Sequence, residues 1–293
     1  MIEPFFSVNG FSSSNMAWFN QKELAVDKRY LKGIKLVRGI RMLLPTTEKL
    51  PDGDAIDALP AASAAAMMLA GQQAALNSAR PALPRIVQGA TLKAPTLRNS
   101  GRLIYAAAGS SGLMALADAC ELPGDTEDDT LAADTVTAPI TPNDSVIVLS
   151  ASGTTPYALA IAVAAQAKGA NVIAIANNPG SALLDHADVA ICLETQSELI
   201  AGSTRMGAAT AQKATLNLMS SLMGIKLGHV YRGEMVNLIA DNAKLQRRAV
   251  RIIAKIADTS ETVARAALAT MGGDTKAAIY WPQAALRQQP QTC

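Results

Sequence analysis

The sequence predicts an α/β protein in which helices cover both faces of a parallel β-sheet. Short runs rich in Val, Ile and Ala alternate with longer helical stretches, and turns rich in Gly, Ser and Thr follow the short runs. This alternation is typical of parallel sheets, whose strands are buried on both faces. Aromatic residues make up only 4% and hydrophobic residues 49% of the 293 residues. The chain is therefore long and apolar enough to bury a sizeable core.

Four runs are the expected strands, and each one leads into turn residues. Helical patterning resumes after each turn, most clearly over residues 156–168 and 205–226. Because parallel strands end at the same edge of a sheet, the turns that follow them should gather there. The four runs are residues 102–107, 145–149, 171–176 and 189–193.

The regions around these strands predict further helices. The Ala- and Gln-rich residues 55–100 predict helices that are broken near Pro81 and Pro84, because proline ends a helix that it cannot continue. Residues 230–270 predict more helix. The Gln- and Pro-rich tail from residue 282 to residue 293 predicts a frayed end.

The chain is expected to have three parts. Residues 1–45 form an N-terminal extension of unknown role that contains all four Phe residues and a basic stretch, Lys28–Arg41. That stretch fits a helix on nucleic acid or membrane, but the solvated face of an ordinary helix or a poorly ordered extension explains it as well. Residues 46–230 form the sheet-containing domain, and residues 231–293 form a helical region.

Composition excludes several classes of protein. A net charge of +2 gives no electrostatic argument for a nucleic-acid partner. No apolar run reaches the length of a membrane span, and the start of the chain does not resemble a secretory signal, so we expect a cytoplasmic protein without a membrane partner. Three separated cysteines and two histidines predict neither a disulfide framework nor a metal site: Cys120, Cys192, Cys293, His186 and His229.

Three of the loops that follow strands combine small residues with hydroxyl groups. Glycine lets the backbone approach an anion, hydroxyls add hydrogen-bond donors, and the N–H groups that begin the next helix favour negative charge. One such loop is ordinary turn chemistry, whereas three in series predict an anion site, most simply for a phosphate group. The candidate residues are Gly109, Ser110 and Ser111; Ser150, Ser152, Gly153, Thr154 and Thr155; and Ser203, Thr204 and Arg205.

Three segments that contain these loops resemble a known family. GRLIYAAAGSSG, LSASGTTPYALA and SELIAGSTRMGAATAQKATLN are similar to sequences of the sugar isomerase (SIS) fold. Within that fold they most resemble N-acetylmuramic acid 6-phosphate etherases and the related glucokinase regulatory proteins. The resemblance extends from residue 46 to residue 276. It implies an SIS-type three-layer architecture, in which helices cover both faces of a parallel sheet, with flanking helices.

The resemblance also implies an activity. The etherases convert N-acetylmuramic acid 6-phosphate into N-acetylglucosamine 6-phosphate and D-lactate during amino-sugar and cell-wall recycling. The chemistry is proton abstraction beside the open-chain aldehyde, loss of lactate and addition of water, with no metal or organic cofactor. The implied partners are a phosphorylated amino sugar and a second copy of the chain, because SIS domains usually form homodimers.

Three carboxylates are candidates for the catalytic acid and base. Glu121, in the sequence DACELP, resembles the first catalytic carboxylate of the family, and Glu127 resembles the Glu of a Glu-Asp pair that carries the second. Glu198 lies five residues before Ser203, where related sugar-phosphate isomerases place a base. Glu121 could instead end a helix, Glu127 could belong to an acidic surface loop, and Glu198 could be an ordinary loop acid.

This chain departs from the pattern that it resembles. About thirty residues separate the two carboxylates in the etherases, whereas Glu121 and Glu127 are six apart. Basic residues usual in the family are replaced by Leu113, Thr154 and Gly207, and each lost charge-assisted hydrogen bond would cost about 1.5–3 kcal/mol. A sugar-phosphate sensor without catalysis is therefore an alternative to the etherase. An isomerase and an SIS transcription regulator are further alternatives.

Overall fold

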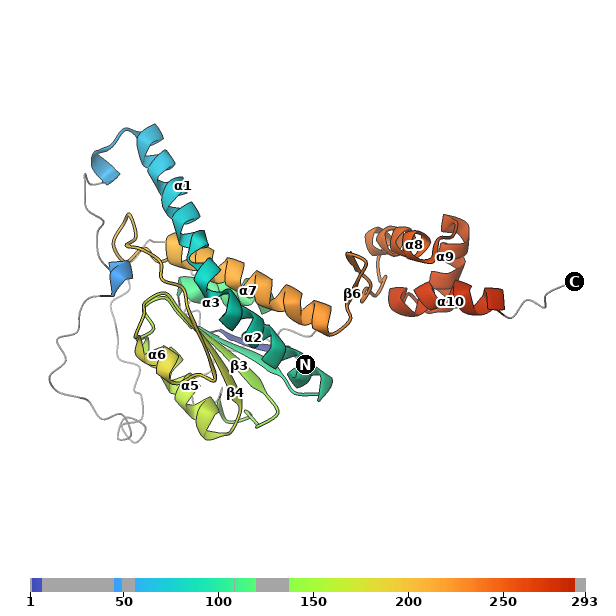
Figure 1. Cartoon of the computed structure of the whole chain (residues 1–293), viewed down its shortest axis with the longest axis horizontal. Helices are drawn as coiled ribbons and strands as arrows, with labels where there is room; N and C mark the ends of the chain where they lie inside the picture. Colours follow the sequence, from blue (N-terminus) through green and yellow to red (C-terminus); the bar gives the residue numbers. More distant parts are fainter. Residues whose placement is uncertain (1, 7–44, 49–55, 108, 120–136, 288–293) are drawn as a thin grey trace, which may run out of the picture. The chain divides into compact units, whose positions relative to one another are not determined.

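The computed structural model describes residues 2–6, 45–48, 56–107, 109–119 and 137–287. The chain divides into two compact units, Met1–Ser220 and Ser221–Cys293. Each unit has a hydrophobic core of its own. The first unit contains the sheet and the second is mainly helical (Figure 1). None of the helices in the described ranges has the length and hydropathy that a membrane crossing requires.

The first unit is an α/β structure built on a parallel sheet of five strands in the order β1-β2-β3-β4-β5. The four expected strands are confirmed, and a fifth, β1, comes from the N-terminal extension and pairs with β2. In the common register Leu103 lies opposite Ser145, and Ser145 lies opposite Asn171. The strands are β1 (Ile2–Phe6), β2 (Leu103–Ala107), β3 (Ser145–Ser150), β4 (Asn171–Ala176) and β5 (Val189–Cys192).

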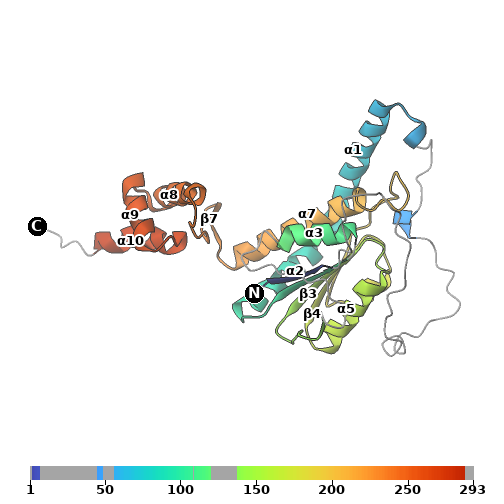
Figure 2. The same ribbon diagram turned by 180° about the vertical axis from the view of Figure 1, so that it is seen from behind.

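Helices cover both faces of this sheet, as Figures 1 and 2 show. On one face lie α5 (Pro156–Ala167) and the short α6 (Ala182–Asp185), which pack on the apolar side chains of β2, β3 and β4. On the other face lie α2 (Ala79–Arg98), α3 (Ser110–Ala119) and α7 (Gly207–Lys226). β2, β3 and β4 are buried on both sides, which explains their nearly continuous apolar sequences.

The helix break in residues 55–100 lies at Ser78 rather than at a proline. α1 (Ala61–Asn77) ends there and α2 begins at Ala79, so the break expected near Pro81 occurs three residues before it, whereas the break expected near Pro84 is wrong. Pro81 lies in the first turn of α2, where the backbone N–H has no helical partner to lose. Pro84 lies inside the helix, which continues to Arg98. Two short 3-10 helices precede α1, at Thr46–Glu48 and Ile56–Ala58.

A buried polar cluster joins α2, β2, α3 and α7. Lys93 is fully buried and donates hydrogen bonds to the hydroxyls of Tyr105 and Ser220, each at 2.9 Å. Both hydroxyls donate to Asp118, at 2.7 and 2.6 Å. Burial lowers the pKa of Lys93 to about 8, although Asp118 opposes that shift. Because buried polar groups are costly unless they are paired, this cluster fixes the relative position of the four elements.

The second unit contains a small antiparallel hairpin and three helices. The hairpin, β6 (Val230–Tyr231) and β7 (Glu234–Met235), was not expected within residues 230–270, whereas the helices α8 (Ala243–Ala257) and α9 (Glu261–Thr270) were. α8 and α9 begin at side-chain caps, which are Asn242 and Ser260. The last helix, α10 (Thr275–Arg287), extends six residues into the tail that was expected to fray.

Candidate functional site

Two of the candidate loops begin at neighbouring strand ends. Ala107, the last residue of β2, lies opposite Leu149 of β3. Gly109 therefore begins its turn beside the loop that starts at Ser150. Gly109 has a positive φ of 61°, which favours glycine, and its surroundings would leave a side chain in open space. The hydroxyl groups of both loops thus belong to the carboxyl edge of the sheet, where ligands bind in open α/β folds.

The loop after β3 is held by its own hydroxyl groups. Ser150 is buried, and its Oγ accepts a hydrogen bond from the backbone N–H of Gly153 at 3.0 Å and lies 2.8 Å from Oγ1 of Thr155. The Oγ of Ser152 accepts from the hydroxyl of Thr154 at 3.0 Å. Ser152 is half-buried and Thr154 is exposed. The buried hydroxyl therefore shapes the loop, and the outer hydroxyls remain at its surface.

Gly153 is required in this loop for two reasons. Its φ is +68°, in the left-handed region that other residues adopt only with strain. A Cβ at this position would also lie 2.1 Å from the Oγ of Ser181. The turn therefore fits closely against the segment that follows β4, and this contact sets the direction in which the loop leads into α5.

The N-terminus of α5 has no side-chain cap. Thr155 is the N-cap residue, yet its side chain accepts no hydrogen bond from the first turn, and Pro156 follows it. The first N–H groups of a helix lack partners within the helix and carry partial positive charge. In α5 these groups follow the hydroxyl-rich loop directly, which makes this end of the helix suitable for an anion.

The third loop reaches the first one across the edge of the sheet. It follows β5, and its Thr204 Oγ1 lies 3.2 Å from the Oγ of Ser110, which begins α3 after β2. The structure thus brings together two residues that are 94 positions apart in sequence. Ser203 is half-buried and Arg205 is exposed. Ser111, by contrast, is buried in the first turn of α3.

Glu198 occupies the N-terminus of α7. Its two carboxylate oxygens accept hydrogen bonds from the backbone N–H groups of Gly207, at 3.0 Å, and Ala208, at 2.9 Å. The residue is 4% exposed, and it lines a small cavity together with Ala75 and other residues of α1. A buried carboxylate at this position is stabilised by the helix dipole and by two charge-assisted hydrogen bonds. The N–H groups in the first turn of α7 are therefore already paired with an anion, the carboxylate of Glu198.

Two further polar groups at this edge were missed in the sequence. Asn178 accepts a hydrogen bond from the N–H of Thr46 at 2.6 Å and donates to the hydroxyl of Thr47 at 3.3 Å. The carbonyl of Thr47 accepts from Gly202 at 2.9 Å. This short segment thereby links the turn after β4 to the third loop. The only signal in the sequence was the turn Asn-Asn-Pro-Gly after a strand, which also occurs in ordinary turns.

Several predicted positions give a mixed result. Glu121 and Glu127 lie outside the described residues. Among the positions where the resembling family has basic residues, Leu113 is exposed, as is Thr154, and Gly207 is buried against Ala75 and Glu198. Within the described ranges, no group of three or more His, Cys, Asp and Glu side chains is placed to hold a metal ion.

Comparisons with known proteins match the same region. A family model described as SIS domain matches residues 96–222. An N-acetylmuramic acid 6-phosphate etherase from Deinococcus radiodurans is 35% identical over 261 residues, which cover 80% of this chain and 86% of that protein. One from Symbiobacterium thermophilum is 38% identical, covering 67% of this chain and 74% of that protein. Among solved structures, a phosphoheptose isomerase from Francisella tularensis has a TM-score of 0.46 and 21% identity, and covers 57% of this chain and 98% of that chain.

Proposed function

We propose that this chain, which belongs to the family of N-acetylmuramic acid 6-phosphate etherases, is itself a carbon–oxygen lyase that acts on that phosphorylated amino sugar. The products would be N-acetylglucosamine 6-phosphate and D-lactate. The observation that carries the proposal within the structure is the uncapped N-terminus of α5, which follows a hydroxyl-rich loop at the carboxyl edge of the sheet. We infer that the sugar phosphate binds there.

The phosphate site would combine backbone and hydroxyl donors from three loops. The first turn of α5 would supply N–H groups, and Ser152 and Thr155 would supply hydroxyls from the same loop. Ser110 and Thr204, which are 3.2 Å apart, would close the site from the other side. Arg205 is exposed and would face the second anion of the substrate, the lactyl carboxylate.

We assign the chemistry to Glu121 and Glu127, on the family resemblance of the residues around them. A carboxylate base would remove the proton from C2 of the open-chain sugar, and the electron pair of that bond would form a double bond to C3 as lactate leaves. The second carboxyl group would donate a proton to the leaving oxygen. Water would then add its hydroxyl at C3 and give its proton to the second carboxylate, while the first carboxyl group returns the abstracted proton to C2. The elimination and the hydration therefore need neither an oxidant nor a reductant.

Glu198 would have a different role. Both of its oxygens accept backbone hydrogen bonds from α7, and the segment between Glu198 and that helix contains Ser203 and Thr204. We therefore propose that Glu198 positions the third loop rather than abstracting a proton. Both carboxylate oxygens are already engaged by helix N–H groups, which favours a positioning role over proton abstraction.

The lyase activity can be tested directly by incubating the purified protein with N-acetylmuramic acid 6-phosphate and measuring released D-lactate. We expect lactate from the wild type, and a decrease in kcat of at least about 100-fold for Glu121→Gln, since general acid–base groups contribute about 10²–10⁴-fold. Glu194→Gln is the matched control, because Glu194 is an exposed acid at the end of β5. Full activity of Glu121→Gln would remove Glu121 from the catalytic role.

One observation favours the alternative function, a sugar-phosphate sensor without catalysis. This alternative predicts the opposite result in the lactate assay. The described site contains one exposed arginine, Arg205, and the positions of Leu113 and Thr154 contribute no charge. If the protein is a sensor, calorimetry would detect N-acetylglucosamine 6-phosphate binding while no D-lactate is released. That result would exclude the lyase and retain the binding site.

We further propose that the protein is a cytoplasmic homodimer. α1 supports the dimer, because Ala75 alone among the 17 residues of this helix is buried. Large apolar side chains therefore remain exposed on its surface. Met67, Leu69 and Leu76 are 40%, 60% and 46% exposed. Light scattering after size exclusion should give twice the chain mass of 30.5 kDa. A mass of one chain at micromolar concentration would contradict this.

A further inference from the structure

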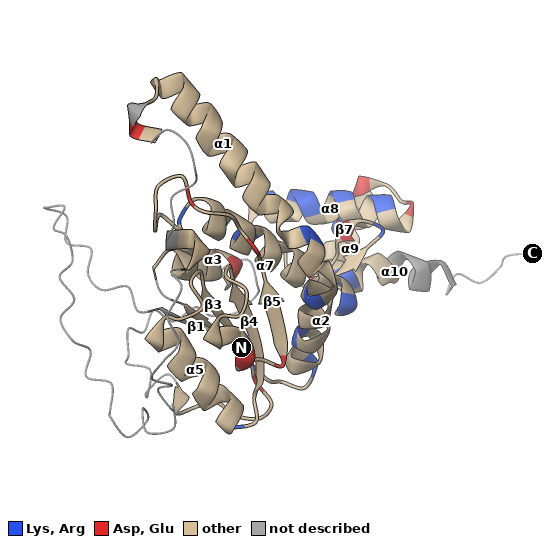
Figure 3. Ribbon diagram, turned by 60° about the vertical axis from the view of Figure 1, so that its left-hand side comes forward, with Lys and Arg blue, Asp and Glu red and all other residues tan. Residues whose placement is uncertain are grey.

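The charge of the chain is divided unequally between its two units. Residues 221–293 contain ten Lys and Arg against five Asp and Glu, a net charge of +5, whereas residues 1–220 contain sixteen against nineteen, a net charge of −3. The total of +2 conceals this difference. Half of the basic residues of the second unit lie on α8, where Figure 3 shows them along the helix.

One face of α8 is entirely basic. Five residues at helical spacing are exposed, while the opposite face is buried in the core of the unit. Over these eleven residue steps the face extends about 16 Å, long enough for several consecutive phosphates. Only the last of the five has an acidic partner within 4.0 Å among the described residues, namely Glu234 at 2.6 Å. The five are Lys244, Arg247, Arg248, Arg251 and Lys255.

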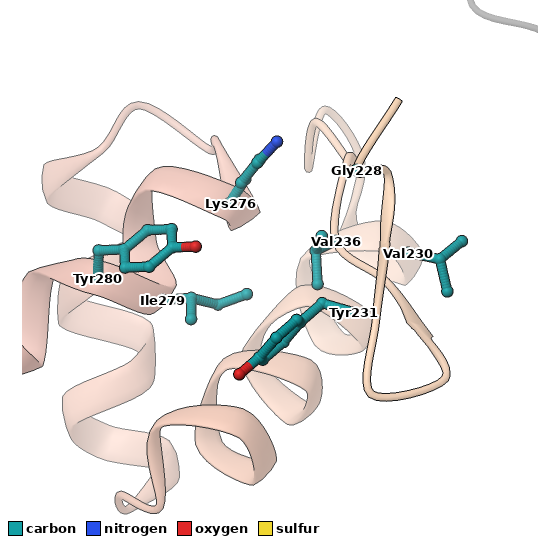
Figure 4. A pocket seen from close by; sticks show the side chains of 7 residues that line it. All are labelled: Gly228, Val230, Tyr231, Val236, Lys276, Ile279 and Tyr280. Atoms are coloured by element: carbon teal, nitrogen blue, oxygen red, sulfur yellow. The ribbon is translucent and has the colours of Figure 1, made fainter. Parts of the chain in front are cut away.

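Next to the hairpin, two exposed tyrosines flank a cavity of about 220 Å³. Tyr280 of α10 is 63% exposed and Tyr231 of β6 is 49% exposed. Figure 4 shows Tyr280 and Lys276 on one wall and Tyr231 on the other. Arg232 lies 5.5 Å from the centre of the Tyr231 ring. Aromatic faces, cations and a hollow are therefore combined in one place.

The basic face of α8 and the tyrosine-lined cavity are adjoining surfaces. Tyr231 pairs with Glu234 across the hairpin, and Glu234 holds Lys255. The pKa of Glu234 is lowered, first by the hydrogen bond from Lys255 and then by the charges of Lys255, Arg251 and Arg248. These cations of α8 are therefore close to the strand pair that forms one wall of the cavity.

We propose that this surface of the second unit binds single-stranded nucleic acid. A row of cations that follows the backbone, beside aromatic rings on which unpaired bases stack, is the combination that such proteins use. Arginine suits phosphate because its guanidinium donates two parallel hydrogen bonds. A membrane surface fits less well, since the apolar face of α8 is buried in the core and has nothing to insert. The proposal is independent of the lyase function.

The test measures binding of the full-length protein to a fluorescent single strand of about 20 nucleotides by anisotropy over a range of salt concentrations. We expect a dissociation constant of about 10⁻⁵ M near physiological salt. Arg247→Gln/Arg248→Gln/Arg251→Gln should weaken binding at least about tenfold at low salt. It should also reduce the slope of log K against log salt by about 2, because each phosphate contact contributes about 0.7.

Two comparisons make the result specific. Tyr231→Ala/Tyr280→Ala should weaken binding about tenfold without changing the salt slope, since stacking does not release counterions. The matched control, Arg80→Gln/Arg85→Gln/Arg98→Gln, removes three exposed arginines from α2 and should bind as the wild type does. Unchanged thermal unfolding midpoints would show that the variants fold.

Four outcomes would overturn the proposal. The first three are no binding at 50 mM salt, tighter binding to a duplex of the same length, and an equal loss of binding in the α2 control. The fourth is that the α8 variant loses binding to vesicles of anionic phospholipid but not to the single strand. The last outcome would assign the surface to membranes. Retained lyase activity in every variant would separate these failures from a failure of the catalytic proposal.

Discussion

The two edges of the central sheet use polar residues in opposite ways. At the amino edge the charges are paired within the chain: Asp144 accepts hydrogen bonds from Arg102 and Thr141, and Arg102 also donates to the carbonyl of Pro139. Lys168 donates to the carbonyls of Thr137 and Ala138. At the carboxyl edge the loops contain neutral hydroxyls, glycines and a helix N-terminus without a cap.

The difference shows which polar groups serve the fold and which remain for a ligand. A charge whose partners lie in the same chain stabilises the native state and has little capacity left for another molecule. Neutral N–H and hydroxyl donors at a helix N-terminus can bind an anion. No charged side chain at that place has to be desolvated first. Glu198 follows the first pattern although it lies at the second edge, which makes α7 and α5 a natural pair for comparison.

The largest effect is expected for Gly153→Ala. The new Cβ would meet Ser181, and the backbone would be strained at positive φ, so the free energy of unfolding should fall by about 3–5 kcal/mol. Phosphosugar affinity should fall at least about 100-fold because the loop must shift. Calorimetry and chemical denaturation measure both. Gly180→Ala is the control: its φ is +67° but no atom lies near its Cβ, so it should cost only about 1 kcal/mol.

A smaller effect, on stability alone, is expected at the amino edge. Burial by itself would raise the pKa of Asp144, but hydrogen bonds from Arg102 and Thr141 outweigh burial and lower the pKa to about 2. The carboxylate therefore stabilises the fold above pH 4, and this contribution is lost as the pH falls through 2. Asp144→Asn should cost about 1–2 kcal/mol at pH 7 and almost nothing at pH 2.

Ligand binding by the same variant tests whether the two edges of the sheet have separate roles. Phosphosugar affinity of Asp144→Asn should equal that of the wild type, since Asp144 lies at the edge opposite the candidate site. Asp188→Asn is the matched comparison, because exposed Asp188 accepts a single backbone hydrogen bond from Val172 at 2.7 Å and should cost less. A tenfold loss of ligand affinity in Asp144→Asn would contradict the division of roles.

Thr155→Asp should place a carboxylate at the N-terminus of α5, as Glu198 does at the N-terminus of α7. An aspartate is a better N-cap than threonine, so stability should change by less than about 1 kcal/mol. Because its carboxylate would occupy the place proposed for the phosphate, affinity for N-acetylglucosamine 6-phosphate should fall at least about tenfold. Ser260→Asp, at the capped start of α9, adds the same charge elsewhere. Equal affinities in both variants would refute the phosphate site at α5.

The smallest effect concerns two hydroxyls of the same loop. Ser152→Ala combined with Thr155→Ala should weaken binding of N-acetylglucosamine 6-phosphate by about five- to tenfold, since neutral hydrogen bonds contribute about 0.5–1.5 kcal/mol each. Binding of the unphosphorylated sugar should change much less. Equal losses for both sugars in the calorimeter would mean that this loop does not hold the phosphate.

Local patterns in the sequence determined much of the fold. Apolar runs bounded by Gly and Ser predicted four strands within one residue of their observed bounds, because short-range periodicity decides which segments form strands. The family resemblance of three segments was confirmed by relatives that are 34–38% identical. β1 could not be foreseen, since its role depends on pairing with β2, about one hundred residues away.

By itself, then, the sequence determined the class of the fold, the order of strands and loops, and the three hydroxyl-rich turns, all of which depend on neighbouring residues. Only the tertiary structure decided how those turns are used. It placed Thr204 beside Ser110, closed the first turn of α7 with Glu198 and left that of α5 uncapped. It also placed Lys255 of α8 on Glu234, which pairs with Tyr231 across the hairpin. The physical reason is the same in each case: partners distant in sequence become neighbours only after the core has packed.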